Sequence, residues 1–428
     1  MVEPSRTSLY RGFLLGLVAA SAVLWTLSGS HGFAWMAVTA AFLLIQADFL
    51  ARRAMKGLRA TRRMTPSAFE EDSVEIELIV ENHGVGRVPF VEIVDSFGPD
   101  MSKRRILSLP DPLRPGAAVS AHYRGSCLRG WGIHDVGPLE FSTADPMGIR
   151  WLTRRAAPPV SFDLFPRVQE VPSLPRPGGR QSLVPQDSAS RRTGQSQIFL
   201  SSREYRTGDD FRRIHWRASA RRGALMVKEH EDDLQPTFTL FLDLHADHRA
   251  GTGRRSTREL VVRTAASLLW TAAVQGQFLE ILADDGRPIS IPAGRGMGHF
   301  MTALHELIRI EQQGETHLLD LVDLHIERIA PGSVVAMIFA TAVPELASLR
   351  ELLTRLVARP ARPLAIFIND QAFTAVTRWR LRPEAFEKNR AEMEAVLSAH
   401  ACPHLFLEKV EDLAVELAAF GGRQGATL

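Results

Sequence analysis

The first 64 residues hold the only apolar runs in the chain that are long enough to cross a membrane. Residues 13–27 and 33–50 are almost wholly apolar, and only Ser-Gly-Ser-His-Gly separates them. A helix needs about 20 apolar residues to span the hydrocarbon core of a bilayer. The pattern therefore predicts two transmembrane helices, at about 10–28 and 32–50, joined as an antiparallel hairpin within residues 1–64.

Two other interpretations of these runs compete with the membrane hairpin. A cleaved signal peptide would account for the first run and leave the second unexplained. A hairpin buried in a soluble domain would normally show a polar stripe along each helix. Asp48 lies near the end of the second run, where a carboxylate can reach water. We interpret it as an interfacial residue rather than a proton relay.

Basic residues flank the two runs on one side of the predicted membrane. Arg6 and Arg11 precede the first run, and the connecting loop has no formal charge. The basic residues that follow the second run are Arg52, Arg53, Lys56, Arg59, Arg62 and Arg63. Because cytoplasmic flanks are enriched in Lys and Arg, we expect both termini and the soluble domains in the cytoplasm.

Residues 65–171 change to short segments in which apolar and polar positions alternate. Val74, Ile76, Leu78 and Val80 alternate with polar residues, as in a strand with one buried face. Further strands are predicted near residues 89–94, 118–123, 133–141 and 160–165, with Gly and Pro between them. This spacing predicts a small antiparallel, immunoglobulin-like β-sandwich. It contains no catalytic constellation.

Residues 172–200 are rich in Pro, Gly, Ser and Gln, which is typical of a flexible linker or long loop. The chain from residue 201 to 428 is predicted to form one α/β domain. Its strands are expected at 237–243, 278–283, 334–340, 364–369 and 404–408, with helices between them. That alternation predicts a doubly wound parallel sheet. Ligands of such sheets bind beyond the carboxyl ends of the strands, which makes Asp243 the best-placed polar residue.

Charge and composition exclude several classes of protein. The formal net charge is +3, but residues 1–64 hold eight basic residues against two acidic ones, and the remainder has 43 basic against 46 acidic residues. The basic pI therefore reflects the membrane flanks and not a nucleic-acid surface. Two cysteines are too few for a disulfide scaffold or a zinc ribbon, and a reducing compartment fits best. No phosphate-binding GxxxxGK[ST] motif occurs, and the sequence supports no catalytic role.

The most distinctive segment is SSREYRTGDDFRRIHWRASARRGALMVKEHED, residues 201–232. Asp209 and Asp210 are placed to cap a helix. One interpretation is a short helix that covers a sheet edge, with its arginines paired or solvated. The other is a docking surface, because guanidinium and carboxylate groups give geometric specificity to a protein partner. A nucleic-acid interface is disfavoured, since no stacking stripe or recognition helix accompanies the arginines.

The same segment resembles the hallmark of bacterial proteins with domain of unknown function 58. The matching positions are Arg203, Glu204, Tyr205, Gly208, Asp209, Asp210, Arg212, Ile214, Trp216, Ala220 and Arg221. Upstream, Asp145, Pro146 and Gly148 resemble the family's DP-x-G turn. The resemblance implies two helices in the bacterial inner membrane, a sandwich and a domain similar to von Willebrand factor type A. It also implies association with MoxR-type AAA ATPases and other proteins with type A domains.

Type A domains typically bind a divalent metal through D-x-S-x-S. Here Asp243 matches the first residue, His245 and Asp247 replace the two hydroxyls, and Thr316 could stand for a later threonine ligand. We therefore expect no cofactor and a metal-free loop, because a structural zinc site needs four protein ligands and magnesium prefers oxygen. The favoured function is a membrane-anchored adaptor that works with an AAA ATPase in envelope or protein-complex assembly. The alternative is a metal-dependent enzyme built around the degenerate type A site.

Overall fold

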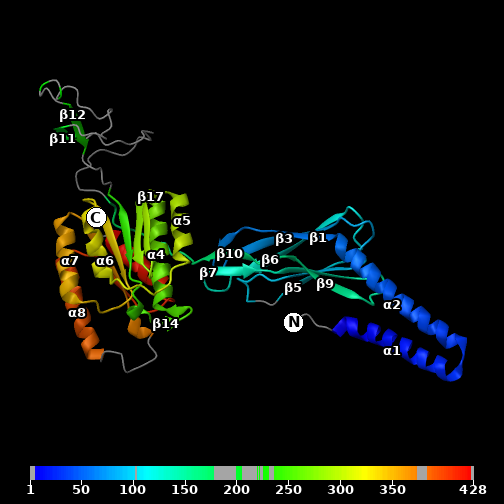
Figure 1. The fold of residues 1–428 in the computed structure, drawn as a ribbon. Coiled ribbons are helices and arrows are strands. Elements are labelled where there is room, and N and C mark those ends of the chain that lie inside the picture. The colour runs from blue at the N-terminus through cyan, green and yellow to red at the C-terminus, as the bar shows by residue number, and fades with distance from the viewer. Residues whose placement is uncertain are drawn as a thin grey trace. The chain divides into compact units, whose positions relative to one another are not determined.

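The computed structural model describes residues 5–101, 104–177, 199–204, 219, 221, 225–230, 236–373 and 383–425 (Figure 1). By its internal contacts the chain divides into two compact units. The first comprises Met1–Arg167 with His305–Arg309, and the second comprises Val168–Leu304 with Ile310–Leu428.

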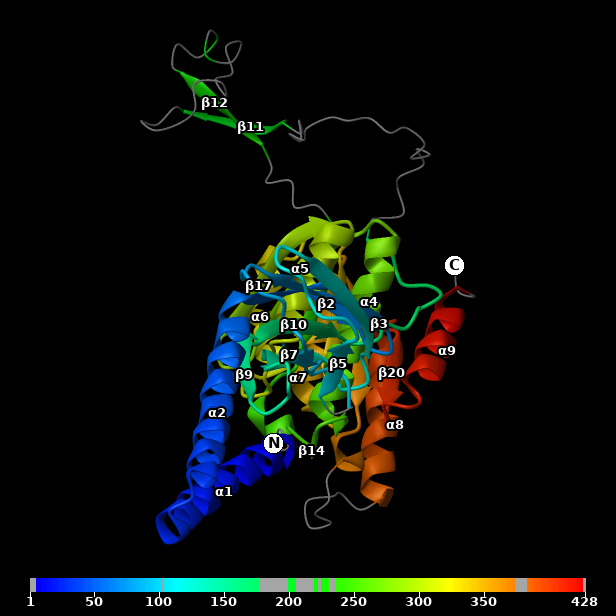
Figure 2. The ribbon, with the colours of Figure 1, turned by 90° about the vertical axis from the view of Figure 1, so that its right-hand side faces the viewer.

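Two antiparallel helices, α1 (Ser5–Ser28) and α2 (His31–Gly57), begin the first unit (Figures 1 and 2). Gly29, with φ 65°, makes the turn between them, a conformation that glycine adopts without a steric penalty. Residues Tyr10–Ser28 and His31–Gly57 are long and apolar enough to cross a membrane. Large apolar side chains on both helices face outward, among them Phe13 at 69% and Trp35 at 72% exposure. The two apolar helices expected from the sequence are present.

Helix α2 is longer than expected and continues directly into strand β1 (Leu58–Arg63). The sequence pattern assigned this stretch to a basic membrane flank, which is wrong for its last residues. Alternate residues of β1 face the interior of the unit. Leu58 and Ala60 are therefore buried, and Arg62 follows on the same face. Asp48 lies inside this longer α2 and not at its end, and it pairs with Arg52 at 2.6 Å and with Arg150 at 3.2 Å.

The rest of the first unit is β-rich and consists of three sheets. The first sheet has the order β1, β3 (Ser73–Asn82), β6 (Ala118–Ser126). The second has the order β2 (Ser67–Phe69), β10 (Val160–Phe165), β7 (Gly132–Val136). The third has the order β5 (Arg105–Leu109), β4 (Val91–Asp95), β8 (Leu139–Ala144), β9 (Trp151–Ala157). Only β2 and β10 pair in parallel among these described strands.

The core of this unit forms where alternate residues of the strands face inward. Val74, Ile76, Leu78 and Val80 of β3 are all buried, as the alternation predicted. Strands β1, β2, β5 and β9 were not expected. Strand β9 contains Trp-Leu-Thr-Arg-Arg-Ala-Ala, whose central residues are exposed, so its sequence lacks a clear apolar face.

The second unit is built on a six-stranded sheet. Its order is β17 (Pro288–Arg295), β16 (Phe278–Asp284), β13 (Phe238–Leu242), β18 (Val334–Phe339), β19 (Arg362–Ile368), β20 (His404–Leu407). The sequence predicted a parallel sheet, but β17 pairs antiparallel to β16, so the sheet is mixed. Strands β16 and β17 are joined by a tight turn in which Gly286 has φ 94°. A connection this short can join only antiparallel strands.

Helices cover both faces of this sheet. They are α4 (Thr257–Val274), α5 (Met297–Leu307), α6 (Leu318–His325), α7 (Leu346–Ala358), α8 (Pro383–Ala399) and α9 (Leu413–Gly425). Residues of α6, α7 and α8 share one buried cluster with Phe241, Met337 and Phe367 of the sheet. Helix α4 lies on the opposite face (Figure 1) and is buried along most of its length.

Two further segments belong to the second unit. Residues 168–177 pack on α4, where Gln169 N donates to Ser267 Oγ at 2.9 Å and Val171 N donates to Thr271 Oγ1 at 3.2 Å. Val171 and Leu174 are buried. Residues 168–171, expected in the β-sandwich, and residues 172–177, expected at the start of a flexible linker, therefore belong to the second unit. Strands β11 (Phe199–Glu204) and β12 (Met226–His230) form an antiparallel ribbon that is not hydrogen-bonded to the six-stranded sheet.

Candidate functional site at the switch point of the sheet

The strand order creates a natural crevice beside β13. The chain places β16 and β17 on one side of β13 and then crosses over to place β18, β19 and β20 on the other. At such a switch point the connections leave in opposite directions, and ligands bind in the crevice beyond the carboxyl ends of the strands. Here these ends belong to β13 and β18, and the residues that follow them are Asp243 and Ala340.

Asp243 is buried and makes four polar contacts, one through its backbone N–H and three through its carboxylate. Its backbone N–H donates to Ile338 O at 2.9 Å. Its Oδ2 atom accepts from Ala340 N at 3.0 Å and lies 2.7 Å from Nδ1 of His248. Its Oδ1 atom accepts from His245 N at 3.2 Å. The side chain is buried, and its hydrogen bonds orient the groups around it.

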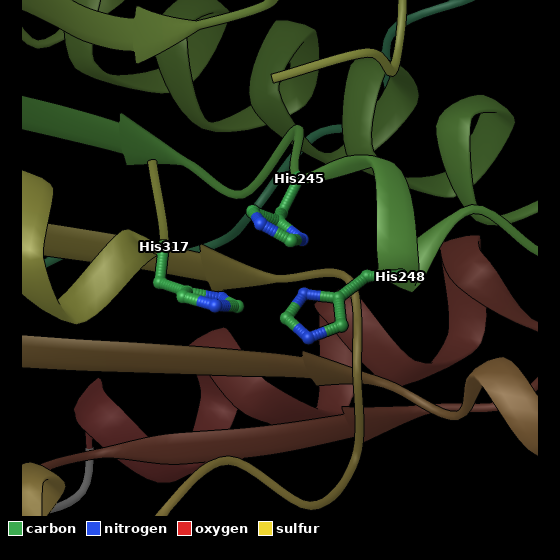
Figure 3. A group of neighbouring side chains, drawn as sticks. All are labelled: His245, His248 and His317. Atoms are coloured by element: carbon green, nitrogen blue, oxygen red, sulfur yellow. The ribbon is translucent and has the colours of Figure 1, made fainter. Parts of the chain in front are cut away.

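Three histidines, one of which contacts this carboxylate, lie close together: His245, His248 and His317 (Figure 3). One ring nitrogen of each lies within 4.8 Å of a ring nitrogen of the other two. His245 stacks on His317 with ring centroids 3.9 Å apart and an 18° interplanar angle. His245 is buried, His248 is half-buried and His317 is exposed, so the cluster extends from the interior to the surface.

A backbone contact at Gly314 brings His317 to the other two histidines. His245 and Gly314 form an isolated parallel bridge, in which Gly314 N donates to Leu244 O at 2.8 Å and Ala246 N donates to Gly314 O at 3.0 Å. A Cβ atom at position 314 would lie 2.1 Å from Asp284 O, so only glycine allows this approach. His317 follows in the same loop as the N-cap residue of α6.

The four residues considered as possible metal ligands, in a loop expected to be metal-free, do not form a single group. Asp243 and His245 lie in the cluster, whereas the Asp247 side chain is 83% exposed. Thr316 lies beside Asp284 instead, to which its hydroxyl donates at 2.6 Å and its N–H at 3.2 Å. The Thr316 hydroxyl bond is the largest of the effects that hold the pKa of Asp284 below its usual value.

Asp243 also determines the charge state favoured by His248. Burial on its own would lower the pKa of this imidazole, because it disfavours the charged form. The hydrogen bond to Asp243 and the negative charge of that carboxylate outweigh burial, so the pKa of His248 is raised above its usual value. The negative charges of Asp370 and Asp247 add to this effect.

A pocket of about 200 Å³ opens next to the cluster. His248 and His317 form part of its wall, and Thr341, Glu345 and Ser348 supply further polar groups. Phe339, Leu318 and Pro344 make another part of the wall apolar. The volume suits a few water molecules or a small polar group beside the imidazoles.

Only part of the distinctive segment falls within the described residues. Arg203 and Glu204 are in β11, where they pair with Val227 and Met226 of β12. Arg221 is helical and exposed, and the Ser219 hydroxyl oxygen accepts from Met226 N at 2.9 Å. The remaining candidate docking residues lie outside the described part of the chain: Tyr205, Gly208, Asp209, Asp210, Arg212 and Trp216. The ribbon thus pairs the chain on either side of these residues.

The ribbon also marks the start of a family match. Residues 201–367 match the model of the family described as "Protein of unknown function DUF58". This part of the chain therefore carries a DUF58 domain. The match begins in β11 and ends in β19, so it includes the ribbon, Asp243 and all three histidines.

No curated protein matches this chain. Among solved structures it is similar to the CARDB domain of a Pyrococcus furiosus protein crystallised with di-metal ions, at 13% identity over 25% of this chain and 91% of that one, with a TM-score of 0.19. It is also similar to a β-glucosidase from Listeria innocua, at 8% identity over 25% of this chain and 16% of that one, with a TM-score of 0.17. A β-glucosidase from Erythrobacter marinus matches at 13% identity, over 25% and 15% of the two chains, with a TM-score of 0.16. At these scores we infer neither fold nor activity from the likeness.

Sequence reasoning found Asp243 and His245 but missed His248 and His317. His248 directly follows Asp247, and His317 directly follows Thr316, so each was adjacent to a residue that was considered. A search for any ligand type, rather than for the hydroxyls of the type A pattern, would have found both.

Proposed function

We propose that this DUF58 chain is a membrane-anchored adaptor that binds a partner protein on the cytoplasmic side of a bacterial inner membrane. In this proposal α1 and α2 cross the bilayer, and the soluble units present a docking surface. The partner class suggested by the family resemblance is a MoxR-type AAA ATPase, with other proteins that have type A domains as further partners.

The observation that supports the proposal best is the direct connection between α2 and the β-rich unit. Gly57 ends the helix, Leu58 begins β1 and is fully buried, and no linker lies between them. Exposed apolar side chains along α1 and α2 need a nonpolar surrounding, which a bilayer supplies. A unit attached in this way stays fixed at the membrane, as an adaptor that recruits a partner must.

The architecture of the second unit supports a type A-like domain. In sequence order its strands are arranged 3-2-1-4-5-6, with the third strand antiparallel at one edge. Strands β11 and β12 pair the two ends of the distinctive segment, residues 201–232. Neither strand is part of the six-stranded sheet. We assign recognition of the partner to this segment, since the sheet does not require it. Its arginines and aspartates supply the bidentate contacts that give specificity.

The proposal is tested by affinity purification of the tagged full-length chain from native membranes. Arg212→Glu reverses a charge in the distinctive segment. It should reduce recovery of the ATPase at least tenfold, since one lost guanidinium contact in an interface costs about 2 kcal/mol or more. Arg350→Glu, at an exposed position of α7, is the matched control and should recover the ATPase as the unchanged chain does.

Two results would count against the adaptor function. One is recovery of equal amounts of the ATPase with Arg212→Glu and with the unchanged chain. The other is purification of the chain without any ATPase, at detergent conditions that keep α1 and α2 solubilised.

A further inference from the structure

We propose that His245, His248 and His317 form a binding site for a transition-metal ion of the zinc class. The site differs from the oxygen-rich magnesium site expected for a type A domain, because its ligand atoms are imidazole nitrogens. The inference concerns the second unit alone and holds whether or not the chain is an adaptor.

The first support is the convergence of three ligand atoms from two distant parts of the chain. The nitrogens lie within 4.8 Å of one another. In a tetrahedral zinc site with Zn–N bonds of about 2.0–2.1 Å, the nitrogens are about 3.4 Å apart. We infer that side-chain rotations close that difference, while the bridge between His245 and Gly314 keeps the two backbone segments together.

The second support is the carboxylate behind His248. A histidine that binds a metal usually donates its other ring N–H to a carboxylate or carbonyl, which fixes the ring and makes it a better ligand. Nδ1 of His248 lies 2.7 Å from Oδ2 of Asp243, and Asp243 is itself held by Ala340 N at 3.0 Å. Nδ1 is therefore occupied, and Nε2 is left to bind the ion.

His245 has a more distant and exposed partner in Asp247. Its Nδ1 atom accepts from Asp247 N at 3.2 Å and lies 3.8 Å from the Asp247 carboxylate. The metal can take the Nδ1 lone pair in place of that long hydrogen bond. Alternatively, Nδ1 carries the proton and faces the carboxylate, while Nε2 binds the ion. In this second arrangement the exposed Asp247 side chain can rotate so that its carboxylate accepts the hydrogen bond from Nδ1 of His245.

His317 is the ligand that must move. It stacks on His245 at 3.9 Å, and two nearly parallel rings do not direct their lone pairs at one point. His317 is exposed, and its side chain makes no capping hydrogen bond to α6, so its ring can tilt out of the stack. The stack is then the metal-free arrangement, and the tilted ring completes the site.

The donor atoms select the metal. Imidazole suits zinc, copper, nickel and cobalt, whereas magnesium prefers oxygen ligands in octahedral array. Three protein ligands with a fourth position open to water or another small ligand are typical of non-structural zinc sites. The adjoining pocket of about 200 Å³ has room for that fourth ligand.

The test uses the full-length chain in detergent, stripped with chelator and titrated with Co²⁺ as a spectroscopic substitute for zinc. We expect one equivalent to give the visible absorption of tetrahedral cobalt, and Zn²⁺ but not millimolar Mg²⁺ to displace it. His317→Ala removes an exposed ligand without disturbing the core. It should weaken binding at least tenfold, because loss of even an outer partner costs about 10- to 100-fold.

His400→Ala is the matched control, since His400 is in the same unit and bonds to Val396 O and Thr354. It should bind cobalt as the unchanged chain does. His248→Ala should weaken binding as His317→Ala does. The inference is overturned if no tetrahedral spectrum appears, if His317→Ala binds as tightly as the unchanged chain, or if His400→Ala loses as much affinity as His317→Ala.

Discussion

Arg62 and Asp95 show how a single buried ion pair anchors β1 in the first unit. Their side chains are 5% and 0% exposed, and Arg62 Nε donates to Asp95 Oδ2 at 2.9 Å. Arg62 Nη1 also donates to Val136 O at 3.1 Å, and the Tyr123 hydroxyl donates to Asp95 Oδ2 at 2.8 Å. Burial, together with the nearby charge of Asp95, raises the pKa of Tyr123, so this phenol stays protonated. The network gives both charged side chains hydrogen-bond partners from the protein.

Removing one partner of this pair should destabilise the first unit strongly. Arg62→Met keeps most of the side-chain volume but leaves Asp95 buried and unpaired, which typically costs about 3–5 kcal/mol. The melting temperature of the full-length chain in detergent should fall by several degrees. Arg63→Met, with a side chain that is 74% exposed, is the control and should melt with the unchanged chain. Equal melting temperatures for the two variants would contradict the structural role of the pair.

Charge patterns in the sequence could not reveal this role. Arg62 is one of six basic residues after the second apolar run, and counting placed all six beside the membrane. Its partner Asp95 is on β4, which pairs with β5 and β8 rather than with β1. A pair between strands of different sheets leaves no local signal. A polar residue directly after an apolar strand does leave a signal in the sequence. For this reason Asp243 was predicted, whereas its partner His248 was not.

At the scale of elements, periodicity predicted the strands and helices of the second unit well. The strands expected at 237–243, 278–283, 334–340, 364–369 and 404–408 correspond to β13, β16, β18, β19 and β20. Strand β17 was missed because its sequence, Pro-Ile-Ser-Ile-Pro-Ala-Gly-Arg, contains two prolines and a glycine. Proline is tolerated there because β17 is an edge strand.

The loop that ends at α6 decides whether the histidines meet, and Gly314 is its critical position. An alanine Cβ there would lie 2.1 Å from Asp284 O and 3.1 Å from Leu244 O, so the loop would have to shift. We expect Gly314→Ala to lower the melting temperature and to weaken cobalt binding by separating His317 from His245. The two measurements are thermal unfolding and the cobalt titration of the same preparation.

Gly298→Ala separates this effect from a general effect of replacing glycine. Gly298 is near the start of α5, and an added Cβ would meet no atom within 4 Å. Alanine is favoured over glycine in a helix by about 0.5–1 kcal/mol, so this control should melt no lower than the unchanged chain. If Gly314→Ala behaved like Gly298→Ala in both measurements, the bridge to His245 would not be what positions His317.

At the scale of the whole molecule, the reactivity of the two native thiols affects any topology test that uses thiol reagents. Cys127 and Cys402 are both buried. Burial raises the pKa of Cys127 to about 11 and that of Cys402 to about 12. Since the thiolate is the reactive form, neither residue should react with a thiol reagent at neutral pH while the chain is folded. An introduced exposed cysteine can therefore be detected against a low background.

The cytoplasmic orientation proposed for the soluble units predicts which introduced thiol is reached from outside the cell. Ser30→Cys, in the turn between α1 and α2, should react with an impermeant thiol reagent on intact cells, because the uncharged loop faces away from the basic flanks. Ser188→Cys, in the segment outside the described residues, should react only after the cells are permeabilised. Labelling at 188 and not at 30 would reverse the orientation and exclude a cytoplasmic ATPase as partner. Labelling at both positions on intact cells would mean that α1 and α2 do not both cross the membrane, since two crossings place residues 30 and 188 on opposite sides.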